Sequence, residues 1–468
     1  MLRSRLRYGW DTCFGILVAI AAATPVRAQD ITTAFVNVAV VPMDSERVLE
    51  GQTVVVRRDR ITAIGPVGKV RIPAGARRVD GRGKFLIPGL ADMHVHADRG
   101  DSAVTERELF LYIANGVTTT REMGFAPKGV LLSWRARAAT GEVISPRIYV
   151  AAGPRSFNSV GVPARRFVEE AKAAGYDFIK VYGEDGPVLD TIVTTARRVG
   201  LPIVGHAPSF MDSSTALQHA LAAGYTSIEH LTGFERYLTG RPGDWWWWNY
   251  WNDTAFSVAD ARQLLTDSAA IKLRAMATAM RRAGVWNCPT LAMYDATSVD
   301  AADWPELRYF TDSIAAKLRT LQAKYLSPPV REKAQVALEA RRAVVRALRD
   351  AGAGLLLGTD KPAPFMLPGF AVHRELEAFV RAGLTPYEAL ATGTRNVAAY
   401  LGTLDSAGTI AIGKRADLVL LSGNPLDDIR HTMHPAGVML GGRWLAQGKL
   451  DHAMKAAEGR QHGIADIR

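Results

Sequence analysis

The chain has 468 residues, of which 48% are hydrophobic and 22% are charged, and a formal net charge of +11. This is the composition of an ordinary globular protein, long enough for a large core and more than one domain. The Lys and Arg residues are scattered, and neither a zinc-finger spacing nor an aromatic-plus-basic RNA-binding signature accompanies them, so we expect no nucleic acid partner.

Residues 1–28 have the pattern of a signal peptide. They combine a basic start, an apolar core over 14–23 and small residues before Ala28, after which we expect cleavage. The apolar core is shorter than the roughly 20 residues that span a membrane, so no stable membrane span is expected. Cleavage would leave Cys288 as the only cysteine and exclude an intrachain disulfide. We therefore expect a secreted protein, most simply a periplasmic one.

Short runs rich in β-branched residues begin and end the mature chain. They lie at 34–41, 53–56 and 60–64, and again at 416–421 and 437–445, separated by turn residues. Two β segments that bracket a chain predict one small composite β-sandwich, formed by residues 29–86 and 403–450. Residues 451–468 form a C-terminal tail.

Residues 87–402 alternate short apolar strands with helical stretches such as 163–174 and 213–223. Eight such units predict a (β/α)8 TIM barrel, an α/β fold whose active site lies at the C-terminal ends of the strands. The longer stretches 233–284 and 295–353 are expected to be largely helical insertions. The predicted strands lie at 90–96, 117–123, 146–152, 177–182, 201–206, 225–230, 285–291 and 354–360.

The first barrel strand ends in His94-Val-His96. Because side chains alternate between the two faces of a strand, both imidazoles point the same way and are close enough to bind one metal ion. Neutral imidazole is a good ligand for zinc and its neighbours in the transition series. Two histidines in a surface turn would be the alternative for an isolated pair.

Polar residues also occupy the ends of other predicted strands, at His206, His230 and Asp360. Lys180 lies inside the fourth strand between apolar residues, where a free ammonium would repel a nearby divalent metal ion. Its amine could instead carry a CO2-derived carbamate, an anion whose two oxygens can bridge two metals. The alternative for Lys180 is an ion pair with a buried acid such as Glu122 or Asp360.

Several motifs together resemble the amidohydrolase superfamily, in its binuclear subtype with a carbamylated lysine. Within it, the chain is most similar to the branch of imidazolonepropionase-like enzymes and Xaa-Pro or Xaa-Arg dipeptidases. The resemblance covers nearly the whole mature chain. The motifs are Pro88-Gly-Leu-Ala-Asp-Met-His-Val-His96, Phe178-Ile-Lys-Val181, Val204-Gly-His206, Ile228-Glu-His230, Gly358-Thr-Asp360, Ala382-Gly-Leu-Thr-Pro-Tyr-Glu-Ala-Leu390, Thr392-Gly-Thr-Arg-Asn-Val-Ala398 and Gly413-Lys-Arg-Ala-Asp-Leu-Val-Leu420.

The resemblance implies two divalent metal ions, with Zn²⁺ as the expected ion. His94, His96 and Asp360 would hold the more buried metal, and His206 and His230 the more exposed one. The carbamate on Lys180 would bridge the two ions together with a hydroxide. Asp360 would take the proton of that hydroxide and give it to the leaving amine.

Other residues beside the predicted ligands are candidates for substrate binding. Arg121 could bind a substrate carboxylate or pair with Glu122 or Asp92, whereas Tyr182, Lys361 and Tyr294 could line the pocket. The segment Trp245-Trp-Trp-Trp-Asn-Tyr-Trp251 could form a lid or an aromatic wall, contact a membrane surface, or pack against the barrel or a neighbouring subunit. A homo-oligomer is left open.

The leading hypothesis is a secreted binuclear hydrolase that cleaves a C–N amide bond in a small molecule, a dipeptide or an N-acyl amino acid. The same site could instead cleave a cyclic amide, a lactone or a phosphotriester. A one-metal deaminase is disfavoured because it needs no bridging lysine. A non-catalytic binding barrel that uses the Trp-rich segment is a hypothesis of another class.

Overall fold

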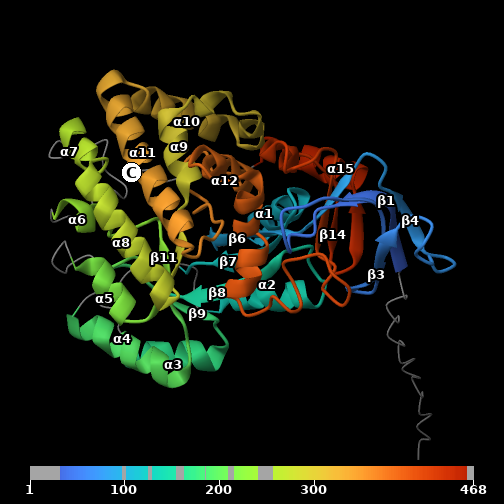
Figure 1. The fold of residues 1–468 in the computed structure, drawn as a ribbon, viewed down its shortest axis with the longest axis horizontal. Helices are drawn as coiled ribbons and strands as arrows, with labels where there is room; N and C mark the ends of the chain where they lie inside the picture. Colours follow the sequence, from blue (N-terminus) through green and yellow to red (C-terminus); the bar gives the residue numbers. More distant parts are fainter. Residues whose placement is uncertain are drawn as a thin grey trace, which may run out of the picture.

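The computed structural model describes residues 32–96, 102–124, 129–153, 163–184, 186–208, 215–240 and 257–460 (Figure 1). The predicted signal peptide and the Trp245–Trp251 segment lie outside these ranges. Within them, no helix combines the length and the apolar character that crossing a membrane requires.

The two ends of the chain build one eight-stranded sheet, drawn in blue and red in Figure 1. The connecting strand is β5, which pairs in parallel with β1 and antiparallel with β13. Phe35, Val54, Leu86 and Leu418 are buried in the core of this unit. Its strands are β1 (Thr32–Val40), β2 (Leu49–Arg57), β3 (Arg60–Pro66), β4 (Arg77–Asp80), β5 (Phe85–Pro88), β13 (Leu418–Leu421), β14 (Pro435–Leu440) and β15 (Arg443–Ala446).

The second unit is a parallel barrel whose seven regular strands follow one another in chain order. All residues of β6 and β7 are buried, as expected for strands covered on both faces. The predicted fold class, an α/β barrel with a separate unit from both termini, is confirmed. The strands are β6 (Leu90–Val95), β7 (Val117–Glu122), β8 (Arg147–Ala152), β9 (Phe178–Val181), β10 (Ile203–Gly205), β11 (Tyr225–Glu229) and β12 (Trp286–Cys288).

Residues 354–361 occupy the place of the eighth strand, between β12 and β6. Isolated parallel bridges join Leu355 to Asn287 on one side and Lys361 to Val95 on the other. The predicted eighth strand is therefore present in position, but it is irregular. Its backbone still bonds to both neighbours, since Leu356 donates to the carbonyl of Asn287 and Asp360 donates to the carbonyl of His94.

The carboxylate of Asp92 explains this irregularity. It accepts the backbone amide of Thr359 at 3.0 Å and the Thr359 hydroxyl at 2.7 Å, in the place of a backbone carbonyl. The same carboxylate accepts the amide of His94 at 3.2 Å. Asp92 thus fixes the ends of β6 and of the closing segment relative to each other, where His94 and Asp360 lie.

Helices surround the barrel (Figure 1). The stretches 163–174 and 213–223, expected to be helical, contain α3 and α5, and the insertions at 233–284 and 295–353 are helical in their described parts. The predicted domain boundaries after 86 and 450 fall inside β5 and α15 and stay predictions. The helices are α1 (Ser102–Ala114), α2 (Val130–Ala139), α3 (Ala164–Ala174), α4 (Gly186–Val199), α5 (Ala216–Ala222), α6 (Phe234–Thr239), α7 (Val258–Gln263), α8 (Asp267–Ala283), α9 (Leu291–Ser298), α10 (Asp312–Tyr325), α11 (Pro328–Ala351), α12 (Phe370–Arg381), α13 (Pro386–Thr392), α14 (Arg395–Tyr400) and α15 (Gln447–Ala457).

Candidate metal centre

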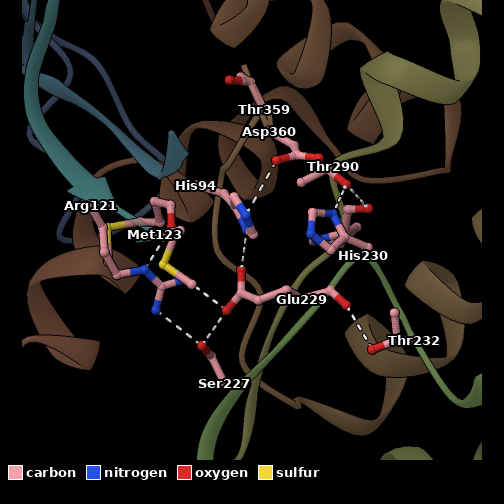
Figure 2. Close-up of polar contacts among 12 residues, drawn as sticks. His94, Arg121, Met123, Ser227, Glu229, His230, Thr232, Thr290, Thr359 and Asp360 are labelled. Atoms are coloured by element: carbon pink, nitrogen blue, oxygen red, sulfur yellow. Dashed lines mark hydrogen bonds and ion pairs between the residues drawn. The ribbon is translucent and has the colours of Figure 1, made fainter. Parts of the chain in front are cut away.

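The structure brings together the four histidines that the sequence places at strand ends. Ring centroids lie 5.4 Å apart for His94 and His96, 4.4 Å for His94 and His230, and 5.2 Å for His206 and His230. Asp360 joins them from the closing segment, with its carboxylate directed at His94 (Figure 2). These five residues come from four separate parts of the barrel rim.

His94, His96 and Asp360 form a group that could hold a metal ion. The Nε2 atoms of both histidines lie 3.4 Å from the same Asp360 oxygen. The Nδ1 atom of His94 faces a Glu229 oxygen at 2.7 Å, and that of His96 faces the carbonyl of Gly124 at 3.2 Å. Since a carboxylate and a carbonyl only accept hydrogen bonds, both Nδ1 atoms carry the proton and both Nε2 lone pairs point at Asp360.

His230 has the same tautomer. Its Nδ1 lies 2.8 Å from the Thr290 hydroxyl, which donates its own proton to the carbonyl of Pro289 at 2.8 Å and therefore accepts from the imidazole. Burial lowers the pKa of His94, His206 and His230 well below the ordinary value, so these rings are neutral. Imidazole Nε2 lone pairs that face a carboxylate, as those of His94 and His96 do, suit a cation, because a cation removes the repulsion between these acceptors.

Lys180 supplies a second observation that fits a metal centre. Its side chain is fully buried, and its Nζ has no hydrogen-bond partner among the residues that the structure describes. The ammonium lies 5.0 Å from the centre of the Tyr182 ring. Burial lowers the pKa of Lys180 to about 8, which enlarges the fraction of neutral amine. The ion pair with Glu122 or Asp360, the alternative from the sequence, is absent from the described structure.

Several non-glycine residues at this rim have a left-handed backbone, among them two candidate ligands and the threonine that contacts His230. The φ angles are 60° for His230, 53° for Thr290 and 53° for Asp360. Each such residue costs about 1–3 kcal/mol, and strain of this kind clusters at functional sites. The surrounding packing therefore holds these side chains in directions that a relaxed backbone would not give them.

A buried polar network lies on the other side of His94 (Figure 2). Arg121 and Glu229 form an ion pair at 2.8 Å, with both side chains fully buried. Ser227 donates to the same Glu229 oxygen at 2.5 Å. The guanidinium also donates to the carbonyl of Met93 at 2.6 Å and to the hydroxyl of Tyr400 at 3.0 Å.

This network corrects the interpretation of Arg121. The guanidinium points into the barrel interior and is fully buried, so it does not offer its donors to a substrate carboxylate. Its acidic partner is Glu229, and neither Glu122 nor Asp92 takes that place. Sequence reasoning missed the role of Glu229. The available signal was a pair of opposite charges, each near the end of a predicted barrel strand.

Tyr182 lies beside the candidate ligands, as the sequence predicts. Its ring centre is 5.3 Å from that of His206, and the side chain is partly buried. Its hydroxyl donates to the carbonyl of Met123 at 2.6 Å, which fixes the ring as a wall of the site. A contact with substrate stays a prediction.

The sequence suggests that Lys361 and Tyr294 line the pocket. In the structure, both side chains contact charged residues of helices instead. The Lys361 ammonium forms a buried ion pair with Glu108 of α1, so the side chain is directed at that helix. Tyr294 is buried in α9, and the guanidinium of Arg341 lies 3.6 Å from its ring centre. Glu108 lies on α1, which follows β6, and Arg341 lies on α11, later in the segment between β12 and residue 354. Spacing along the chain cannot reveal either partner.

The sequence matches the amidohydrolase family over residues 85–445. The chain belongs to the amidohydrolase family. This amidohydrolase is therefore a metal-dependent hydrolase that acts on carbon–nitrogen bonds, and the group of His94, His96 and Asp360 is its candidate metal site.

Similar proteins include an imidazolonepropionase of Symbiobacterium thermophilum, 26% identical to this amidohydrolase over 389 residues, which are 81% of this chain and 86% of the relative. Among solved structures, bottromycin amidohydrolase has a TM-score of 0.68 and 25% identity, with coverage of 91% of this chain and 90% of that chain. A Xaa-Pro dipeptidase with methionine bound in its active site has a TM-score of 0.62 and 20% identity, covering 89% of this chain and 100% of that chain. This last likeness shows the fold alone.

Proposed function

We propose that the protein is a binuclear metal-dependent hydrolase that cleaves the amide bond of a dipeptide or an N-acyl amino acid. Two observations carry the proposal: the Nε2 lone pairs of His94 and His96 converge on Asp360, and the buried Lys180 amine has no hydrogen-bond partner among the described residues. His94, His96 and Asp360 would hold one ion, and His206 and His230 the other. Zn²⁺ suits this set of nitrogen and oxygen ligands.

The Lys180 amine would complete the site as a carbamate. The neutral amine adds to the carbon of CO2 and releases a proton, which leaves an anion with two oxygens that can face both metals. Two observations support this step, namely the burial of Lys180 and its pKa of about 8. The same burial makes the unmodified ammonium unfavourable beside two cations.

Bound divalent ions would supply Lewis acidity, which acidifies water and polarises a carbonyl. Asp360 would carry the proton from the attacking water to the leaving amine, because its oxygen faces His94 and His96 and its side chain is 12% exposed. The rim residue Tyr182 would help to enclose the substrate.

The choice of substrate rests on the similar proteins. A Xaa-Pro dipeptidase and a bottromycin amidohydrolase support an amide within a peptide or a peptide-like molecule. The imidazolonepropionase relatives support a second candidate, hydrolysis of a cyclic amide by the same residues. We further propose that the protein is exported and cleaved after Ala28, which N-terminal sequencing of the protein from separated cell fractions would test.

The test is a screen of the zinc-loaded mature chain against dipeptides, N-acyl amino acids, cyclic amides, lactones and phosphotriesters, with parallel metal analysis. We expect two metal ions per chain and turnover of dipeptides or N-acyl amino acids. Asp360→Asn should abolish turnover, whereas His373→Asn, a change of a buried histidine outside the centre, should keep it. Cleavage of lactones or phosphotriesters alone, or full activity of Asp360→Asn, would refute the proposal.

A further inference from the structure

His94 lies between two acidic groups, one on each ring nitrogen (Figure 2). Asp360 faces Nε2, toward the rim, and Glu229 faces Nδ1, toward the barrel interior. Besides the rim group, His94, Glu229 and Cys288 also come close enough together to suggest a metal site. The guanidinium of Arg121 on Glu229 places a fixed positive charge there, which disfavours a cation at this deeper position.

We infer that the buried Arg121–Glu229 pair is a positioning device that fixes His94 as a metal ligand through Nε2. The inference rests on the metal centre proposed above. It assigns a role in the centre to two residues that would not themselves touch a metal ion or a substrate.

The hydrogen bonds allow one arrangement of these groups. Arg121 only donates hydrogen bonds and keeps its proton in proteins, so the Glu229 oxygen that faces it must accept. That oxygen also accepts from Ser227, which leaves the other oxygen for Nδ1 of His94 at 2.7 Å. The carboxylate therefore requires a proton on Nδ1 and leaves the lone pair on Nε2.

Two further hydrogen bonds of Arg121 hold the ion pair in place. Arg121 donates to the backbone carbonyl of Met93, the residue before His94, and to the hydroxyl of Tyr400. Through Met93 the guanidinium is tied to the strand that carries His94, and through Glu229 it is tied to the imidazole of His94. The ring is thus located by its own strand and by β11 at the same time.

Stability alone does not explain this arrangement. A fully buried ion pair loses the hydration of both charges, and well-packed apolar residues of similar volume often serve a fold equally well. Both side chains here are fully buried. An outer hydrogen bond that sets the tautomer and orientation of a metal-binding histidine is a recurrent device, and its loss typically weakens metal binding about 10- to 100-fold.

The decisive variant is Glu229→Gln, which keeps the size of the side chain. The amide oxygen would stay on Arg121, because two facing donors repel, and the amide nitrogen would then face His94. Its N–H requires a lone pair on Nδ1, which moves the ring proton to Nε2. We expect the Zn²⁺ affinity, measured by competition with a chromophoric chelator, to fall about 10- to 100-fold.

The matched control is Tyr225→Phe. Tyr225 is buried on β11, the strand that carries Glu229, and its hydroxyl has no hydrogen-bond partner among the described residues, so the Zn²⁺ affinity of this variant should stay within about twofold of the wild type. Equal affinity of Glu229→Gln and wild type, or an equal loss in both variants, would overturn the inference.

A second measurement does not depend on the folding of Glu229→Gln. Nitrogen-15 NMR of histidine-labelled, metal-free wild type, with the His94 signal assigned through His94→Asn, should show the proton on Nδ1. A proton on Nε2 would overturn the role of the pair. Failure of the wild type to bind Zn²⁺ would instead count against the proposed metal centre, while the tautomer would still be decided.

Discussion

Two buried histidine–threonine pairs in this protein have the same chemistry, but only one lies in the candidate centre. The Nδ1 atom of His230 lies 2.8 Å from the Thr290 hydroxyl, and that of His373 lies 2.9 Å from the Thr432 hydroxyl. In both pairs the hydroxyl donates to a backbone carbonyl at 2.8 Å. Replacing either threonine by valine therefore removes the same two hydrogen bonds from a buried place.

Each variant, Thr290→Val and Thr432→Val, should lose about 1–3 kcal/mol of stability, the usual cost of leaving a buried donor without a partner. Valine is also β-branched, so the left-handed backbone of Thr290 adds little difference. Only Thr290→Val frees the ring of His230, and it should weaken Zn²⁺ binding about 10- to 100-fold. That loss corresponds to roughly 1.4–2.8 kcal/mol of binding free energy.

The assay combines urea unfolding of the metal-free proteins with chelator competition for Zn²⁺. The expected result is a similar loss of stability in both variants and a loss of metal affinity in Thr290→Val alone. If the two variants bind Zn²⁺ equally well, the hydroxyl of Thr290 does not position His230 and the reasoning is wrong.

Three further changes test other parts of the structure. Lys180→Met should reduce the metal content from two ions to one and leave the metal-free protein at least as stable, as shown by metal analysis and urea unfolding; two retained ions would contradict the bridging carbamate. Burial lowers the pKa of His373 from 6.5 to about 3, so the unfolded chain binds more protons between these values and stability is lost as the pH falls below 6.5. Urea unfolding at pH 7.5 and 5.5 should show about 1.4 kcal/mol less acid loss in His373→Asn than in wild type, and equal losses would refute the assignment. Gly205 has a φ of 142°, and a Cβ there would lie 2.1 Å from the Val181 carbonyl oxygen, so Gly205→Ala should cost at least about 2 kcal/mol and weaken zinc binding. Gly284→Ala, where a Cβ meets nothing within 4 Å, is its control and should bind zinc normally.

The fold and the candidate ligands could be predicted because they depend on local patterns. A buried strand of a parallel barrel is a short apolar run, and its active end is the end that carries a polar side chain. His94, His96, His206 and His230 follow such runs directly. Their convergence then follows from the geometry of the barrel rather than from any particular contact.

The network beneath the centre could not be predicted in the same way. Arg121 and Glu229 are 108 residues apart, on strands that are not neighbours in the sheet. The sequence suggested Glu122 and Asp92 as partners of Arg121, because Glu122 is its neighbour in the chain and Asp92 lies on the preceding predicted strand. Relative height of side chains across a barrel interior depends on strand stagger, which composition does not encode.

The irregular closing segment was equally hidden. Nothing in the run from Gly354 to Asp360 distinguishes it from a regular strand. Its shape follows from the Asp92 carboxylate, which binds the amide and hydroxyl of Thr359 in the place of a backbone partner. A buried side chain on another strand thus decided the backbone conformation.

This closing segment determines when the protein is complete. The hydrogen bond between Thr359 and Asp92 joins residues 267 positions apart. Likewise, β5 can pair with β13 only after the part of the chain near its end has been made. When all four histidines of the centre have been synthesised, residues 354–361 are still missing. The barrel is then open, and β6 is an unpaired edge strand. Contacts of such long range make folding slow and leave that edge available to wrong partners. Metal binding that uses Asp360 would therefore require a closed seam, so a bound ion would report that the barrel is complete.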